Sequence, residues 1–186
     1  MSLSLLSEAR SFLFVPGNRP ERFDKALASP ADMVIVDLED AVPAADKATA
    51  RLALAAAWQQ WPTAQRARIV VRINAAQTDS HQDDLSWLAQ LPGLPAVMVP
   101  KGEKPSDLMG VQQALGEAAT ALIPIIESAE GLANVDALAR SPRVLRLAFG
   151  NLDFQADLGM ACGADEAELA PVRVAIVVAS RRAGLA

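Results

Sequence analysis

The feature that most constrains the fold is a regular alternation of short apolar runs with segments of helical pattern. Six runs have the length of a strand, and in chain order they read "SFLFVPG", "DMVIVDLED", "ARIVVRIN", "AVMVP", "ALIPIIES" and "VLRLAFG". Most of them are continuous rather than alternating, which is typical of parallel strands that are covered on both faces. The sequence therefore predicts an α/β protein with six β-α units.

The segments that follow the runs predict the helices. They read "RPERFDKALAS", "AADKATARLALAAAWQQW", "HQDDLSWLAQL", "SDLMGVQQALGEA", "GLANVDALARS" and "PVRVAIVVASRRAG". An acidic loop is expected between the last strand and the last helix. No linker, low-complexity tract or repeat divides the 186 residues, so we expect a single domain over residues 1–186.

Composition and charge argue against several classes of protein. The net charge is −5 and no basic run occurs, which disfavours a nucleic-acid surface. No apolar run reaches the ~18 residues of a membrane-spanning helix, and the first residues lack the pattern of a signal peptide. Cys162 is the one cysteine, so no internal disulfide can form. We therefore expect a cytoplasmic location.

Alternating strands and helices fit either a doubly wound open sheet or a (β/α)8 barrel of the TIM type. The polar residues favour the barrel, because they follow the carboxyl ends of five consecutive strands. In chain order they are Asp37, Glu39 and Asp40, then Arg72 and Asn74, then Lys101, then Glu127, and then Asp153. An open sheet concentrates its site at one switch point, whereas a barrel gathers residues from many strand ends over one mouth.

Four of these acids would repel one another in one partly dry pocket, and two basic residues can offset only part of that repulsion. The acids are Asp37, Glu39, Glu127 and Asp153, and the bases are Arg72 and Lys101. A divalent cation would balance the remaining charge.

The donor types indicate which cation that is. The chain has no cluster of Cys or His, and its one histidine, His81, lies in a polar stretch and is expected to be exposed. Oxygen-only ligands favour Mg²⁺, or Mn²⁺, over Zn²⁺. Glu127 and Asp153, which follow neighbouring strands, form the best pair of ligands.

Several stretches resemble one known family in the same order along the chain. They are "RSFLFVPGNRPERFDKA", "ADMVIVDLEDAVPAADKATAR", "VVRIN", "VMVPK", "IPIIESAEGL" and "LAFGNLDFQADLG". With these stretches the sequence resembles the β-subunit of citrate lyase and its stand-alone CoA-ester lyase relatives, in the HpcH/HpaI aldolase superfamily. The resemblance covers nearly the whole chain and implies a (β/α)8 barrel.

The resemblance also implies roles for the polar residues. Mg²⁺ would bind to Glu127 and Asp153, and Arg72 would grip the carboxylate and oxo group of a 2-oxo acid. The acids that follow the second strand would orient Arg72 and metal-bound water. Two of these acids, Asp37 and Asp40, are also candidates for proton transfer, whereas Glu39 is expected beside the substrate.

For the thioester, the resemblance implies that the loop "FVPGNRPERFDK" contacts the nucleotide end of coenzyme A through Arg19 and Lys25. Lys101 is a further candidate for substrate contact. An acyl carrier protein thioester could replace the CoA ester. Relatives of this kind form trimers and hexamers, so a homo-oligomer, for example a homotrimer, is expected.

The expected activity is that of a Mg²⁺-dependent carbon–carbon lyase. It would cleave a 3-hydroxy-3-carboxyacyl thioester, such as malyl-, citramalyl- or citryl-CoA, into a 2-oxo acid and an acyl-CoA. The alternatives are a CoA-independent 2-oxo acid aldolase and a non-catalytic subunit of a citrate-lyase-like complex. The family's barrel has eight units, so we expect this chain to lack the last two units and the C-terminal lid.

Overall fold

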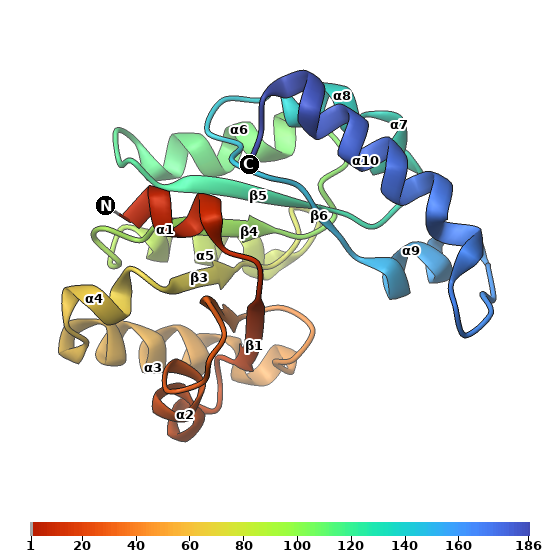
Figure 1. The fold of residues 1–186 in the computed structure, drawn as a ribbon. Helices are drawn as coiled ribbons and strands as arrows, with labels where there is room; N and C mark the ends of the chain where they lie inside the picture. Colours follow the sequence, from red (N-terminus) through yellow and green to blue (C-terminus); the bar gives the residue numbers. More distant parts are fainter. Residues whose placement is uncertain (1) are drawn as a thin grey trace.

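A computed structural model describes residues 2–186. Its six strands form one parallel sheet in which each strand lies beside its neighbours in the chain (Figure 1). The strands are β1 (Phe12–Pro16), β2 (Met33–Asp37), β3 (Ile69–Arg72), β4 (Ala96–Val99), β5 (Ala121–Ile126) and β6 (Ala148–Phe149). A doubly wound sheet would reverse its strand order at a switch point. The strictly sequential order instead produces the curled sheet of a barrel-type fold, so the predicted fold class is confirmed.

One helix, α1, precedes the first strand, and the other helices follow the strands along the chain (Figure 1). The helices are α1 (Ser2–Glu8), α2 (Phe23–Leu27), α3 (Lys47–Gln60), α4 (Thr63–Arg66), α5 (Asp79–Leu88), α6 (Pro105–Leu115), α7 (Ala129–Ala133), α8 (Val135–Ala139), α9 (Asn151–Leu158) and α10 (Ala170–Ala183), with short 3-10 turns η1 (Pro20–Arg22), η2 (Ala44–Asp46) and η3 (Ala167–Leu169). None of the helices within residues 2–186 is long and apolar enough to cross a membrane.

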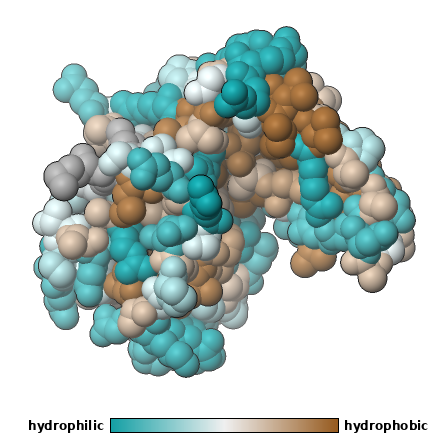
Figure 2. Space-filling view, in the orientation of Figure 1, coloured by the Kyte–Doolittle hydropathy of each residue, from teal (hydrophilic) through white to brown (hydrophobic). Residues whose placement is uncertain are grey.

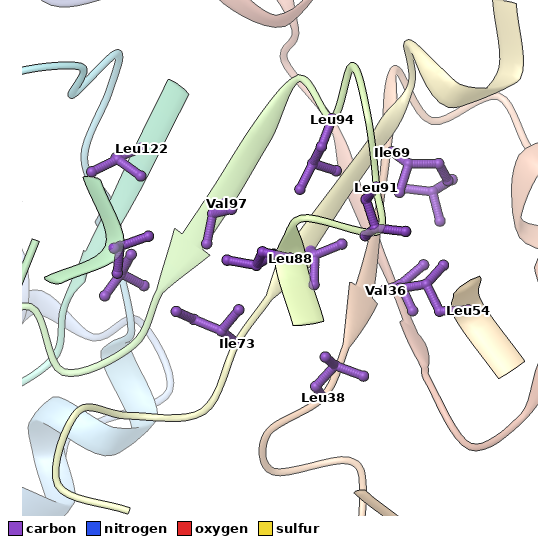
Figure 3. Packing of buried hydrophobic residues seen from close by; sticks show 14 of the residues in the cluster. Val36, Leu38, Leu54, Ile69, Ile73, Leu88, Leu91, Leu94, Val97 and Leu122 are labelled. Carbon is purple, nitrogen blue, oxygen red and sulfur yellow. The ribbon is translucent and has the colours of Figure 1, made fainter. Parts of the chain in front are cut away.

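The larger core lies between the convex face of the sheet and the helices. Val36 and Val97 point outward from β2 and β4, and they pack with Leu54 of α3 and Leu88 of α5 (Figure 3). All four side chains are almost completely buried. Because successive side chains of a strand point to opposite faces, the alternate residues of each strand must line the concave face.

The concave face has a smaller core of its own. Met33 and Ile35 of β2 and Met98 of β4 pack there with Leu6 of α1, whose side chain is fully buried. α1 therefore covers the amino-terminal part of the concave face. Arg146, just before β6, holds it there by donating to the carbonyl oxygens of Ser7 and Ala9.

Four local features differ from the sequence predictions. α1 was not predicted, the expected acidic loop after β6 begins with helix α9, and the last strand is shorter than the run "VLRLAFG". His81 was expected to be exposed, but it is buried, and its Nδ1 lies 2.8 Å from the carbonyl oxygen of Asn74. His81 lies on the inner side of α5, where a polar neighbourhood in sequence does not mean exposure.

The curled sheet has two edges, because β1 and β6 each pair on one side among the described residues. Near the β6 edge, α10 exposes Val174, Val177 and Val178, and Figure 2 shows a brown apolar patch where this helix crosses the molecule. The concave face also leaves Phe14 of β1 partly exposed.

Candidate active site

A cavity of about 420 Å³ opens on the concave face of the sheet. Its floor is apolar and its rim is polar. Side chains from five strands form the floor, namely Phe12, Phe14, Ile35, Met98, Ile123, Ile125 and Phe149. The charged rim includes Arg72, Glu127 and Asp153. The carboxyl ends of the strands thus bring together charged residues that lie far apart in the sequence, as the barrel prediction required.

Arg72 and Asp37 form the best-defined pair at this rim. They end β3 and β2, and the parallel register places them directly opposite each other. The Nε and Nη2 atoms of Arg72 each donate to one oxygen of Asp37 at 2.7 Å. The two Asp37 oxygens also accept from the backbone N–H groups of Glu39 and Ala41. This bidentate, fully occupied carboxylate fixes the plane of the guanidinium group.

Two further acids and one aromatic ring surround the same guanidinium. Arg72 Nη1 lies 2.9 Å from Glu39 Oε2 and 3.3 Å from Asp40 Oδ2, and the Arg72 Cζ atom lies 5.0 Å from the ring centre of Phe14. Burial alone would lower the pKa of Arg72, but the hydrogen bonds and charge of Asp37 outweigh burial and raise it. Arg72 is therefore a permanent, preoriented cation that is suited to bind a carboxylate.

Glu39 is the acid of this group whose protonation is most perturbed. Burial raises the pKa of its carboxyl group to about 8, against the opposing charge of Arg72. Its Oε2 atom forms an ion pair with Arg72, yet within residues 2–186 this buried oxygen has no hydrogen-bond partner. Near neutral pH, Glu39 can therefore hold or release a proton.

Glu127 and Asp153 occupy the opposite part of the rim. Glu127 directly follows β5, and its Oε1 accepts a hydrogen bond of 2.6 Å from the backbone N–H of Lys101. Burial raises the pKa of Glu127 to about 7, and the charge of Asp153, in the first turn of α9, contributes to that rise. The two carboxylates are thus close enough to influence each other, and both face the cavity.

The donor set of this corner fits a divalent cation that prefers oxygen. Within residues 2–186, no group of three or more His, Cys, Asp or Glu side chains is arranged to hold a metal ion by itself. Mg²⁺ typically needs only one or two protein carboxylates and takes its other ligands from water and substrate. Glu127 and Asp153 could supply that pair, and the open cavity leaves room for the rest.

The other predicted site residues lie outside the cavity lining. Arg19 and Lys25 are exposed in the segment that follows the carboxyl end of β1, at the same end of the sheet as the rim. The side chain of Lys101 is also exposed, and its backbone contacts Glu127. Asn74 is not at the rim, because its amide donates to the buried Asp84 of α5 at 2.7 Å.

Three residues that contribute to the site were not predicted. Phe14 lies against Arg72, and its alternation with Phe12 on β1 could have placed it on the concave face. Lys47, at the start of α3, donates its Nζ to the carbonyl oxygens of Leu38 and Glu39 and so holds the acidic loop. Gly150 packs against Glu127 so closely that a Cβ atom there would lie 2.5 Å from Oε2. The sequence shows Gly150 only as a turn residue.

Together these features define a barrel-type α/β protein with an arginine clamp and a carboxylate pair above one mouth. The family model for HpcH/HpaI aldolase/citrate lyase matches residues 10–186. The chain belongs to this family.

Individual relatives agree with the family assignment. The chain is 37% identical over 183 residues to a citrate lyase subunit beta-like protein of Deinococcus radiodurans, covering 95% of this chain and 63% of that protein. It is 37% identical over 162 residues to an L-malyl-CoA/beta-methylmalyl-CoA lyase of Cereibacter sphaeroides, covering 81% and 51%. The chain therefore spans between about half and two thirds of these curated relatives.

A solved structure supports the fold. The citrate lyase beta subunit of Mycobacterium tuberculosis, complexed with oxaloacetate and magnesium, matches with a TM-score of 0.81 at 34% identity. The match covers 100% of this chain and 78% of that one.

Proposed function

We propose that the protein is a Mg²⁺-dependent carbon–carbon lyase. Its substrate would be a 3-hydroxy-3-carboxyacyl thioester of the malyl-, citramalyl- or citryl-CoA type, and its products a 2-oxo acid and an acyl-CoA. The observation that carries the proposal is that a preoriented guanidinium and a pair of carboxylates share one cavity with an apolar floor. A relative named malyl-CoA lyase and a relative complexed with oxaloacetate and magnesium support it.

In this proposal Arg72 binds the substrate carboxylate that becomes part of the 2-oxo acid. Asp37 keeps the guanidinium in one orientation, so little reorganisation is needed as charge shifts onto the adjacent oxygen. Glu127 and Asp153 would hold the divalent cation. The chemistry that a bound divalent cation supplies is Lewis acidity toward the hydroxyl and carboxylate oxygens.

The reaction also needs a proton to move. The hydroxyl loses its proton, the carbon–carbon bond breaks, and its electron pair passes to the thioester as an enolate, which then takes up a proton. All of the oxygens of Asp37 already accept hydrogen bonds, so this residue acts through Arg72. Asp40 at the exposed side, and Glu39 with its pKa of about 8, are the acids that we propose for proton transfer.

For the thioester handle, we propose coenzyme A or an acyl carrier protein. Arg19 and Lys25 are exposed beyond the carboxyl end of β1, where they could contact phosphate groups. Their location at the same end of the sheet as the rim supports this assignment.

We further propose that residues 1–186 belong to a single barrel domain that two more β-α units and a lid would complete. Support comes from the two edges at β1 and β6 and from the greater length of the curated relatives. Assembly as a homotrimer or hexamer, in the cytoplasm, is part of the same proposal. Light scattering of the purified protein would measure the assembly.

An activity assay tests the function. The purified protein is incubated with Mg²⁺ and either malyl-, citramalyl- or citryl-CoA or the matching free hydroxy acids, and 2-oxo acid and acyl-CoA are both quantified. Formation of both products from a CoA ester supports the lyase. Turnover of only the free hydroxy acids would indicate an aldolase instead, and no turnover of any substrate by the full-length protein would favour a non-catalytic subunit.

A further inference from the structure

The residue that follows β4 has an unusual backbone. Lys101 has a φ of +46°, and it is one of three non-glycine residues with positive φ in residues 2–186. A lysine in this left-handed region costs free energy that a glycine would not cost. Residues held in such conformations persist only when their surroundings demand them, and they cluster at functional sites.

The surroundings of Lys101 do fix its backbone. The next residue, Gly102, donates its N–H to the carbonyl oxygen of Ile125 at 3.0 Å. A Cβ atom on Gly102 would lie 2.9 Å from Pro124 Cβ, and one on Gly131 would lie 2.8 Å from the Gly102 carbonyl oxygen. The chain is thus confined between β5 and α7 immediately after Lys101.

The left-handed turn directs one polar group toward the proposed metal corner. The N–H of Lys101 donates to Oε1 of Glu127 at 2.6 Å, whereas the Lys101 side chain is exposed. On the other side of the carboxylate, Gly150 leaves the space that Oε2 occupies. Glu127 is therefore held through Oε1. Its other oxygen, Oε2, lies beside Gly150, which directly precedes helix α9, the helix that carries Asp153.

We infer that Lys101 is a positioning residue that acts through its strained backbone N–H, which fixes the rotamer of Glu127 for cation binding. The inference rests on the proposed function, because it assigns Glu127 as a ligand of the divalent cation. It differs from a role in substrate contact, which would require the Lys101 side chain.

Substitutions at this one position separate the two roles. Lys101→Ala removes the side chain and keeps the N–H, and alanine, like lysine, is neither glycine nor β-branched. Lys101→Gly also keeps the N–H and removes the strain. Lys101→Val keeps the N–H but opposes the left-handed conformation, because β-branched residues rarely adopt it.

We would measure Mg²⁺ affinity by calorimetry and KM for the CoA ester in each variant. We expect the Mg²⁺ affinity of Lys101→Ala and Lys101→Gly to stay within about twofold of wild type, and that of Lys101→Val to fall by about tenfold. Wild-type Mg²⁺ affinity in a folded Lys101→Val protein would overturn the inference. So would a tenfold fall in the Mg²⁺ affinity of Lys101→Ala, because this variant keeps the N–H and the result would assign the role to the side chain.

A second measurement keeps the inference testable if Lys101→Val does not fold. In NMR spectra, the amide proton of Lys101 should resonate downfield because its acceptor is a carboxylate, and Glu127→Gln should move it upfield. No change on that substitution would overturn the inference. Absence of Mg²⁺ binding to wild type would instead contradict the proposed function, while the amide signal would still report the hydrogen bond.

Discussion

The two parts of the rim differ in how many hydrogen bonds and ion pairs their charged groups form within the protein. At the ends of β2 and β3, Asp37 accepts four hydrogen bonds and Arg72 meets three acids. At the ends of β5 and β6, Glu127 accepts one hydrogen bond from the described residues, from Lys101, and Asp153 is exposed at the start of α9. In the first region the carboxylate of Asp37 is satisfied by groups of the protein, whereas the second region leaves carboxylate oxygens available.

In the proposed function, this difference gives the two regions different tasks. A guanidinium whose orientation is fixed beforehand loses little when it binds an anion, which suits it to recognise the substrate carboxylate. Two neighbouring carboxylates with few donors attract a cation, because each disfavours the charge of the other. The comparison can be tested by substitutions that affect one region and leave the other intact.

The largest expected effect follows from removing the charge of Asp37, which pairs with Arg72. The side chain of Asp37 is 1% exposed, and that of Asp40 is 65% exposed, although both pair with Arg72. Asp37→Asn should lower the free energy of unfolding by about 3–5 kcal/mol, because it leaves a buried guanidinium poorly paired. The matched change Asp40→Asn should cost at most about 1 kcal/mol. Denaturant unfolding measures both, and equal losses would show that burial does not distinguish the pairs.

Arg72→Lys tests the clamp itself. Lysine keeps the charge but lacks the planar fork that binds a carboxylate with two hydrogen bonds. We expect kcat/KM to fall by an amount equivalent to about 2–4 kcal/mol in the barrier, with Mg²⁺ affinity nearly unchanged. The control is Arg140→Lys, at an exposed arginine 3.9 Å from Asp136, which should retain activity. Near-normal turnover of Arg72→Lys would reduce Arg72 to a structural role.

Asp153→Asn tests the acidic corner. Asparagine keeps the size and one acceptor oxygen but removes the charge. The Mg²⁺ concentration needed for half-maximal activity should rise about tenfold or more, and tenfold corresponds to about 1.4 kcal/mol. Stability without metal should not fall, because the repulsion between Asp153 and Glu127 is relieved. An unchanged Mg²⁺ requirement would place the cation elsewhere.

The smallest expected effect concerns Glu39 and pH. The pKa of its carboxyl group is raised from 4.5 to about 8, so the folded protein holds this proton more tightly than the unfolded chain does. Its contribution to stability is therefore full below about pH 4.5 and is lost as the pH rises through about 8.

Glu39→Gln should remove this dependence, because glutamine has no charge to bury. Without Mg²⁺, we expect the unfolding midpoint of the variant to exceed that of wild type by about 2–4 °C at pH 8.5, which corresponds to about 1 kcal/mol. The difference should shrink toward pH 5. If the unfolding midpoints of wild type and Glu39→Gln differed by the same amount at every pH in this range, the pKa of Glu39 would not be raised.

The positions of Asp37 and Arg72 at the carboxyl ends of neighbouring strands could be predicted from the sequence. Asp37 and Arg72 end apolar strands, and parallel pairing of neighbouring strands leaves little freedom in where their side chains meet. Glu127 could be placed for the same reason. These predictions depend on local pattern and on a topology that brings the strand ends together.

The parts that the sequence did not predict depend on contacts between distant residues. α1 is short, and its Leu6 becomes buried only against the concave face of the assembled sheet. His81 is buried through its contact with the Asn74 carbonyl oxygen, although its sequence neighbours are polar. The left-handed backbone of Lys101 could not be predicted, because positive φ is usually indicated by a glycine and this residue is a lysine. The contacts of the residues that follow Lys101 impose this conformation.

Thermal melting of the metal-free protein as Mg²⁺ is added, with Ca²⁺ as a size control, tests the proposed cation site most directly. The comparison uses wild type, Glu127→Gln and Glu117→Gln, which makes the same chemical change at an exposed residue before the amino end of β5. At about 100 times Kd, binding should stabilise wild type and Glu117→Gln by about 2.7 kcal/mol, while Glu127→Gln should gain much less at the same Mg²⁺ concentration. Equal shifts in all three proteins, or none in wild type, would contradict the assignment of the β5–β6 corner as the cation site.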